Sequence, residues 1–131
     1  MTDTPTNRDS AWLRRALSAI DMVFFDGLLE EHEVTVRWSR WRQVKPGSYF
    51  IYATYLEHSI EVNRALAWHW VPDFVVMSTI YHEALHHVVG MEHDLAFRFA
   101  EQKFPHYAEA AVWEVENLQK LKEAANPIGR T

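Results

Sequence analysis

The chain contains no cysteine, and this absence excludes two kinds of structure. Disulfide bridges cannot form, and a zinc site built from thiolates cannot exist. Long apolar runs are also missing, so the sequence predicts no segment that spans a membrane. Residues 1–8 are polar and lack the basic and then apolar pattern of a secretory signal. We therefore expect a cytoplasmic protein without a membrane partner.

Positive charge is scarcer than negative charge. Thirteen Lys and Arg residues stand against 18 Asp and Glu residues, which gives a formal net charge of −5. This balance argues against a protein that binds duplex nucleic acid by neutralising phosphates. The positive residues gather only in segment 37–45, RWSRWRQVK, where stacking on tryptophan and ion pairing could bind single-stranded nucleic acid. In an acidic chain a solvated strand end and loop is the simpler interpretation, so nucleic-acid binding is kept as an alternative.

The length and composition allow a single domain. The chain has 131 residues, and 48% of them are hydrophobic. That is enough for one compact core and too little for two. We expect one domain over residues 1–131, with loose tails at 1–6 and 127–131.

The period of the apolar residues changes along the chain. Residues 7–27 show helical spacing, which predicts an amphipathic first helix. Residues 34–38 and 59–63 alternate, and residues 48–55 are rich in aromatic and β-branched side chains. The sequence therefore predicts an α+β fold with a three-stranded antiparallel sheet, packed on the first helix and on the helix that follows the strands.

Two helices are predicted at the C-terminal end. One follows His93 and ends near residue 103, before a Phe-Pro pair. The other covers residues 107–125 and ends before an Asn-Pro pair. We expect its inward face to consist of Ala111, Val112, Val115, Leu118 and Leu121.

The pentapeptide HEALH at residues 82–86 carries the clearest chemical signal. It lies in an apolar stretch with Pro72 where a helix should begin and Gly90 where it should end. Histidines four residues apart lie on one face of a helix, so both imidazoles can reach one metal ion. Glu83 can then lie beside a water that the ion holds, as a general base. Inside a largely buried helix these polar side chains cost free energy unless they are hydrogen-bonded or bind a metal.

A catalytic zinc ion needs a third protein ligand. His93 follows the glycine at a spacing close to that of zinc peptidases whose third ligand comes after a glycine turn. We favour it because neutral imidazole leaves the ion more electrophilic than a second anion would. His87 points about 100° away from His86 on the helix and cannot easily serve. The carboxylates that could replace His93 are Glu92, Asp94, Glu101 and Glu109.

These residues and their surroundings resemble the SprT-like zinc metallopeptidases and the small bacterial metal-dependent hydrolases of the YgjP type. The resemblance covers roughly residues 24–113 and rests on these segments: Phe25-Asp26-Gly27-Leu28, Trp38-Ser39-Arg40, Gly47, Ile60-Glu61-Val62-Asn63, Val71-Pro72, Tyr81 to His86, His93 with Phe97, Phe104-Pro105-His106-Tyr107 and Trp113. It implies a minimal zincin with His82, His86 and His93 as zinc ligands and Glu83 as the catalytic glutamate. The cysteine-bearing zinc-ribbon extension of some SprT-like proteins is absent, which weakens the transfer of a DNA-associated role.

The expected activity is hydrolysis of a peptide bond in a peptide or protein substrate. Imidazole ligation favours Zn²⁺ over manganese, iron or cobalt. In zincins the substrate lies extended beside an edge strand, and residues 60–63 are the candidate strand. The candidate donors to the developing oxyanion are Tyr52, Tyr81, His106 and Tyr107. Two alternatives remain: hydrolysis of another amide or ester at the same site, and a binding or scaffold protein with a structural or vestigial zinc ion.

Overall fold

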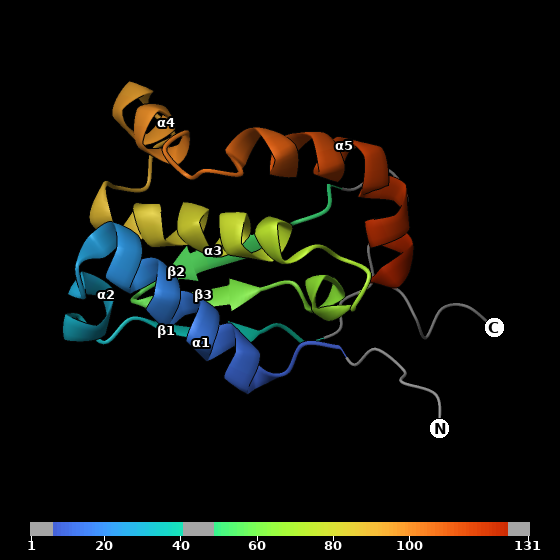
Figure 1. Ribbon diagram of the computed structural model, residues 1–131, viewed down its shortest axis with the longest axis horizontal. Coiled ribbons are helices and arrows are strands. Elements are labelled where there is room, and N and C mark those ends of the chain that lie inside the picture. Colours follow the sequence, from blue (N-terminus) through green and yellow to red (C-terminus); the bar gives the residue numbers. More distant parts are fainter. Residues whose placement is uncertain (1–6, 41–48, 126–131) are drawn as a thin grey trace.

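The computed structural model describes residues 7–40 and 49–125 of the chain (Figure 1). It has the predicted α+β class. The predicted tails and most of the basic segment 37–45 lie outside the described residues. The elements, in chain order, are α1 (Ser10–Ile20), the π-helical turn η1 (Asp21–Phe25), α2 (Leu28–Glu31), β1 (Thr35–Trp38), β2 (Ala53–Leu56), β3 (Ser59–Val62), the 3₁₀ turn η2 (Arg64–Ala67), α3 (Asp73–Val88), α4 (Leu95–Glu101) and α5 (Tyr107–Ala124).

A side-chain cap begins the first helix, and two residues with left-handed backbone conformation end it. The Asp9 carboxylate accepts a hydrogen bond from the Trp12 backbone N–H at 2.7 Å and caps α1. The helix continues through η1 and stops at Asp26 and Gly27, whose φ angles of 55° and 84° are left-handed. The buried Asp21 carboxylate then accepts from two N–H groups at the start of α2, a short helix that the sequence analysis did not predict.

The sheet is mixed, and the prediction of a wholly antiparallel sheet is wrong. The strand order is β1-β3-β2, with β1 parallel to β3 and β2 antiparallel to β3. Among the described strands, β2 and β3 form a hairpin, through a tight turn in which Glu57 and His58 both have positive φ. Strand β3 lies between the other two strands and runs in the same direction as β1. Side-chain alternation shows which face a residue occupies but not the direction of its neighbour strand, so the sequence could not predict this order.

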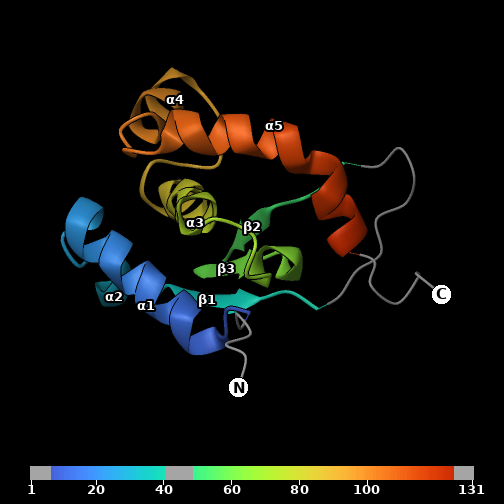
Figure 2. The ribbon, with the colours of Figure 1, turned by 45° about the vertical axis from the view of Figure 1, so that its right-hand side comes forward.

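The helices form two layers on one face of the sheet (Figures 1 and 2). Helix α1 packs on β1, and α3 packs on β2, β3 and α1. Ile60 and Val62 of β3 point into this layer and are fully buried, as predicted. Helix α5 lies across the far side of α3 and also contacts η2. As a result, α3 is enclosed between the sheet and α5.

Burial on both sides explains the apolar sequence of α3. Its core-facing residues are Val75, Val76, Ile80, Ala84 and Leu85. The helix begins at Asp73, one residue later than predicted, and Pro72 is its N-cap residue. After Val88 the chain turns at Gly90, whose φ of 141° suits glycine. None of the helices within the described ranges is long and apolar enough to cross a membrane.

The predicted inward face of α5 is wrong at all but one of its positions. Of the residues predicted to face inward, Leu121 is buried, but Val112 and Val115 are 57% and 80% exposed. The other buried residues of this helix are Ala110 and Ala124. Trp113 packs with the buried side and stacks on Trp70 at a ring-centroid distance of 6.2 Å. Both sets of residues follow helical spacing, so periodicity could not decide between them. The alanines face the core because they allow α5 to approach α3 closely.

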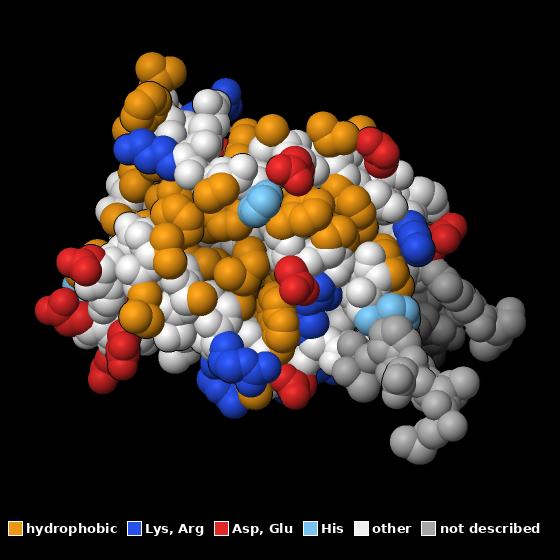
Figure 3. Space-filling view, viewed as in Figure 1, with side chains coloured by type: hydrophobic (Ala, Val, Ile, Leu, Met, Phe, Trp, Pro, Cys, Tyr) orange, Lys and Arg blue, Asp and Glu red, His pale blue; other side chains and the backbone are white. Residues whose placement is uncertain are grey.

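Helix α4 is short and mostly exposed. The Asp94 carboxylate caps it by accepting from the Phe97 N–H at 2.9 Å. Phe97 is its one buried residue, while Leu95 and Phe99 are exposed. Hydrophobic side chains gather on the projection at the upper left of Figure 3, where α4 lies in Figure 1. Phe97 and Glu101 connect α4 to the candidate metal centre.

Candidate metal centre

Three histidines converge between α3 and the loop before α4. The nitrogens that His82, His86 and His93 offer all lie within 4.8 Å of one another. The Nε2 atoms of His86 and His93 are 3.1 Å apart. Two nitrogens bound to one tetrahedral zinc ion at about 2.0–2.1 Å would be separated by about 3.3 Å, so the observed spacing suits a shared ion. The three histidines named from the sequence are therefore placed to bind a metal ion.

Hydrogen bonds on the opposite ring nitrogens orient the two helical histidines. Nδ1 of His86 donates to the Gly90 carbonyl at 3.0 Å, and Nδ1 of His82 bonds to the Glu101 carboxylate. A carbonyl can only accept, so the proton of His86 lies on Nδ1 and its Nε2 lone pair is free for a metal. Such outer contacts fix the tautomer and the ring orientation of metal-binding histidines. Glu101, considered above as a rival ligand, instead orients His82.

Phe97 forms a floor beneath all three imidazoles. Its ring stacks on His86 at 4.6 Å between centroids and contacts the rings of His82 and His93 at 5.1 and 5.0 Å. The side chain is buried, so it restricts the rotamers available to the three rings. The sequence offers an apolar residue three positions after Asp94 but no sign of this role.

The other carboxylates considered as third ligands have different places. Asp94 caps α4, and Glu109 pairs with His106 at 3.2 Å. Glu92 is exposed and does not belong to the cluster that can hold an ion. His93 itself is exposed, and the Arg98 side chain donates to its carbonyl at 3.2 Å. This contact holds the loop in the position that brings His93 to the other two histidines.

Glu83 lies beside the centre and is only 6% exposed. One carboxylate oxygen is 3.8 Å from Nε2 of His82, the nitrogen that His82 leaves free for a metal. Burial, and secondly the charge of Glu101, raise the pKa of Glu83 to about 7. A cation held by the three histidines would act in the opposite direction, because it favours the ionised carboxylate. This position suits a group that exchanges a proton with a metal-bound water.

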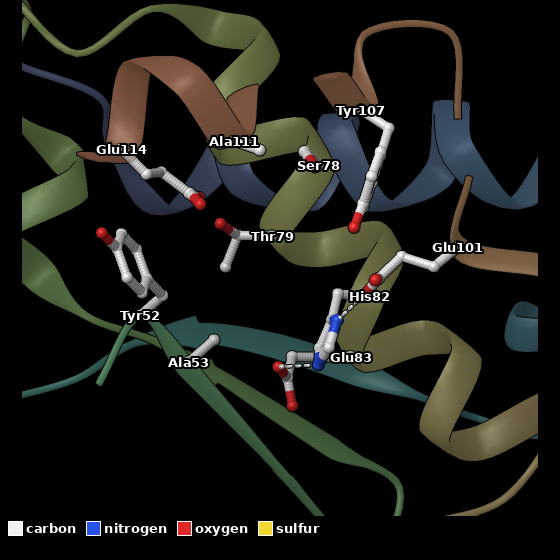
Figure 4. A pocket seen from close by; sticks show the side chains of 10 residues that line it. All are labelled: Tyr52, Ala53, Ser78, Thr79, His82, Glu83, Glu101, Tyr107, Ala111 and Glu114. Carbon is white, nitrogen blue, oxygen red and sulfur yellow. Dashed lines mark hydrogen bonds and ion pairs between the residues drawn. The ribbon is translucent and has the colours of Figure 1, made fainter. Parts of the chain in front are cut away.

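A pocket of about 340 Å³ opens beside the centre (Figure 4). His82 and Glu83 lie at one end, and Tyr52 and Glu114 at the other. Strand β2 forms one wall, α5 the opposite wall, and α3 the floor between them. We call this pocket the cleft.

The candidate oxyanion donors separate into two groups. The Tyr81 hydroxyl donates to the Ala100 carbonyl at 2.8 Å, and its ring packs on neighbouring phenylalanines, so this tyrosine is structural. His106 pairs with Glu109 and does not line the cleft. Tyr52 and Tyr107 do line it.

Both tyrosines of the cleft keep their protons at neutral pH. Burial and then Glu114 raise the pKa of Tyr52 to about 12. Burial and then the charge of Glu101 also raise the pKa of Tyr107. The Tyr107 hydroxyl points toward Glu101 and His82 (Figure 4). The Tyr52 hydroxyl can therefore donate a hydrogen bond to a bound molecule, and the Tyr107 hydroxyl can do so in exchange for its hydrogen bond to Glu101.

His87 points away from the centre, as its helical position predicts. Its Nδ1 meets the Tyr55 hydroxyl at 2.6 Å, and its Nε2 meets Nδ1 of His32 at 2.7 Å. His58 contacts the same group through the His32 carbonyl. Burial, followed by the charges of His58 and His32, lowers the pKa of His87. This second histidine group is separate from the three candidate ligands.

The predicted edge strand must be corrected. Residues 60–63 lie mainly in β3, and β3 is the central strand. Of the described strands, β1 and β2 form the edges, and only β2 borders the cleft.

Of the basic segment 37–45, residues 41–45 lie outside the described part. Arg37 pairs with Glu61 at 3.1 Å, and the Trp38 indole donates to the Asp9 carbonyl.

No protein-family model matches this chain, and neither does any curated protein or solved structure. The chain is an α+β protein in which three histidines are placed to bind a metal ion.

Proposed function

We propose that the chain is a zinc-dependent peptidase of the minimal zincin kind, as its resemblance to SprT-like proteins implies. The observation that carries this proposal is the convergence of the three histidines beside a buried Glu83, at one end of a cleft. A structural zinc site is normally closed by four protein ligands. The described residues offer three, with a carboxylate next to the space that remains, and this supports a catalytic site over a structural one.

The chemistry divides between the ion and the protein. When bound, zinc lowers the pKa of a water and polarises the substrate carbonyl. Glu83 accepts a proton from the water while the water oxygen forms a bond to the carbonyl carbon. The carbon–nitrogen bond then breaks, and Glu83 passes the proton to the leaving amine nitrogen. Glu101 and the Gly90 carbonyl keep His82 and His86 in the orientation that this step needs.

The cleft supports a peptide as the substrate. Strand β2 pairs with β3 along one side, and the structure describes no strand on its other side. An extended peptide can add to such an edge through main-chain hydrogen bonds. Such a peptide would pass beside Ala53 and Glu83, both of which line the cleft. Tyr107 is our candidate donor to the developing oxyanion, because its hydroxyl points into the cleft toward His82.

The test uses protein loaded with one equivalent of zinc and a mixture of internally quenched peptides. We expect cleavage that stops with a chelator and returns with zinc. Glu83→Gln should keep the zinc and lose activity by a factor of about 10²–10⁴, because a general base is removed. Glu116→Gln, an exposed position on α5, is the matched control and should keep both. Equal activity of the Glu83→Gln and wild-type proteins, or no cleavage of any peptide by zinc-loaded protein, would refute the proposal.

A further inference from the structure

The cleft has an acidic lining. Glu83, Glu101 and Glu114 all contribute to it, and none of its described lining residues is Lys or Arg. The proposed mechanism uses Glu83 at the metal and Glu101 on His82. Glu114 has no such task, although it comes from a different helix and turns into the cleft at the end away from the metal centre (Figure 4).

Glu114 is held without a compensating partner. Within residues 7–40 and 49–125, no hydrogen bond or ion pair reaches its carboxyl group. Burial, and secondly the charge of Glu101, raise its pKa to about 7. Burying an ionisable group in this way costs free energy unless a partner compensates. A side chain with this cost and no internal partner is suited to bind a group that arrives with a ligand.

Two hydroxyl groups at the same end of the cleft also lack partners. Thr79 is only 6% exposed, and its hydroxyl points toward Glu114 without a hydrogen bond to any described residue. The Tyr52 hydroxyl likewise makes none with the described part of the chain, and the influence of Glu114 on the pKa of Tyr52 shows that the two lie close. Both hydroxyl groups belong to residues that line the cleft, where a bound molecule can reach them. These oxygens can all accept hydrogen bonds, and none of the described residues that line the cleft places a Lys or Arg side chain against them.

A cationic side chain meets these requirements. The ammonium group of lysine has three N–H donors and the guanidinium of arginine has five, with no acceptor in either. A positive charge would also favour the ionised form of Glu114. A neutral polar group would supply fewer donors and would leave the carboxylate charge uncompensated.

The position suits a substrate residue close to the scissile bond. Thr79 precedes Glu83 by about one turn of α3, which is about 6 Å along the helix. An extended peptide advances about 3.3 Å per residue, so a long side chain one or two residues from the reacting carbonyl can reach Glu114.

We propose that the Glu114 end of the cleft is a binding subsite for a lysine or arginine side chain of the substrate, with Thr79 and Tyr52 as accessory acceptors. This inference rests on the proposed peptidase function for its biological meaning. It can nevertheless be tested by binding alone.

The experiment compares peptides that differ only in charge. Each peptide of an alanine-rich series carries arginine, or its neutral isostere citrulline, at one position. Binding to the zinc-loaded protein is measured by titration calorimetry, and cleavage is measured in parallel. At the position that reaches the subsite, we expect the arginine peptide to bind at least about tenfold more tightly than the citrulline peptide. Glu114→Gln should reduce this ratio to near one, and Glu116→Gln should leave it unchanged.

Two further variants show whether a lost arginine preference comes from the lost carboxylate or from misfolding. Glu114→Asp keeps the charge on a shorter side chain and should retain part of the preference. Thr79→Val removes one acceptor and should reduce the ratio less than Glu114→Gln does. No arginine preference at any position, or the same preference in Glu114→Gln, would overturn the subsite. Displacement of the arginine peptide by millimolar Mg²⁺ or Ca²⁺, through Glu114, would also overturn it, because the site would then be a metal site.

The outcomes separate this inference from the proposed function. Cleavage without an arginine preference would refute the subsite and support the peptidase. Arginine-dependent binding that Glu114→Gln abolishes, without cleavage of any peptide, would support the subsite and refute the peptidase.

Discussion

Glu114→Gln should stabilise the fold at neutral and alkaline pH and leave it unchanged in acid. The pKa of the Glu114 carboxyl rises from an ordinary 4.5 to about 7 on folding, through burial and then the charge of Glu101. Below pH 4.5 the group is neutral in both the folded and the unfolded chain. Between pH 4.5 and 7 it ionises only in the unfolded chain, which lowers the free energy of unfolding. Above pH 7 this loss is constant.

The magnitude follows from the shift. At about 1.36 kcal/mol per pKa unit, the change from 4.5 to about 7 corresponds to roughly 3 kcal/mol. Glu114 is only partly buried, so solvent screening reduces the expected effect to about 1–2 kcal/mol. Glutamine has nearly the same shape and no charge, so the substitution should recover this amount at pH 8.

Urea unfolding of the metal-free wild-type, Glu114→Gln and Glu116→Gln proteins at pH 5 and pH 8 measures the effect. Glu116→Gln changes the net charge equally from an exposed position and controls for the overall charge. The reasoning fails if Glu114→Gln destabilises the protein at pH 8, or if its effect is the same at both pH values. If Glu114→Gln stabilises the protein, the carboxylate of Glu114 lowers the stability of the fold. This result would agree with a residue that serves binding at some cost in stability.

Two further predictions concern the metal centre. Glu101→Gln should weaken zinc binding by a factor of about 10–100, measured by competition with a chromophoric chelator, because Glu101 orients His82; unchanged affinity would show that His82 needs no such support. Acidification below about pH 5–6 should release zinc, because protonated imidazoles cannot bind it. The burial that lowers the pKa of His82 extends zinc binding toward lower pH. Stoichiometric zinc in dialysed protein at pH 4 would contradict histidine ligation.

The strand order shows where pattern reasoning stops. Alternation at residues 59–63 correctly placed Ile60 and Val62 on the buried face. It could not show that β3 lies between β1 and β2, because strand direction depends on the path of the connections. The error mattered for function: it assigned the substrate edge to the central strand, whereas β2 borders the cleft. The exposed valines of α5 are a similar case, since one helix carried two apolar faces and only packing on α3 selected one.

What the sequence alone determined is local. The spacing of His82 and His86 and the place of Glu83 follow from helical geometry, and a glycine turn brings His93 back within a few residues. The tertiary structure alone decided everything that joins distant segments: Glu101 against His82, Phe97 beneath the three rings, and Tyr52, Thr79 and Glu114 around the end of the cleft. The physical reason is that a helix fixes neighbours three and four residues apart by its own hydrogen bonds. Contacts between elements depend on which faces the whole chain can bury together.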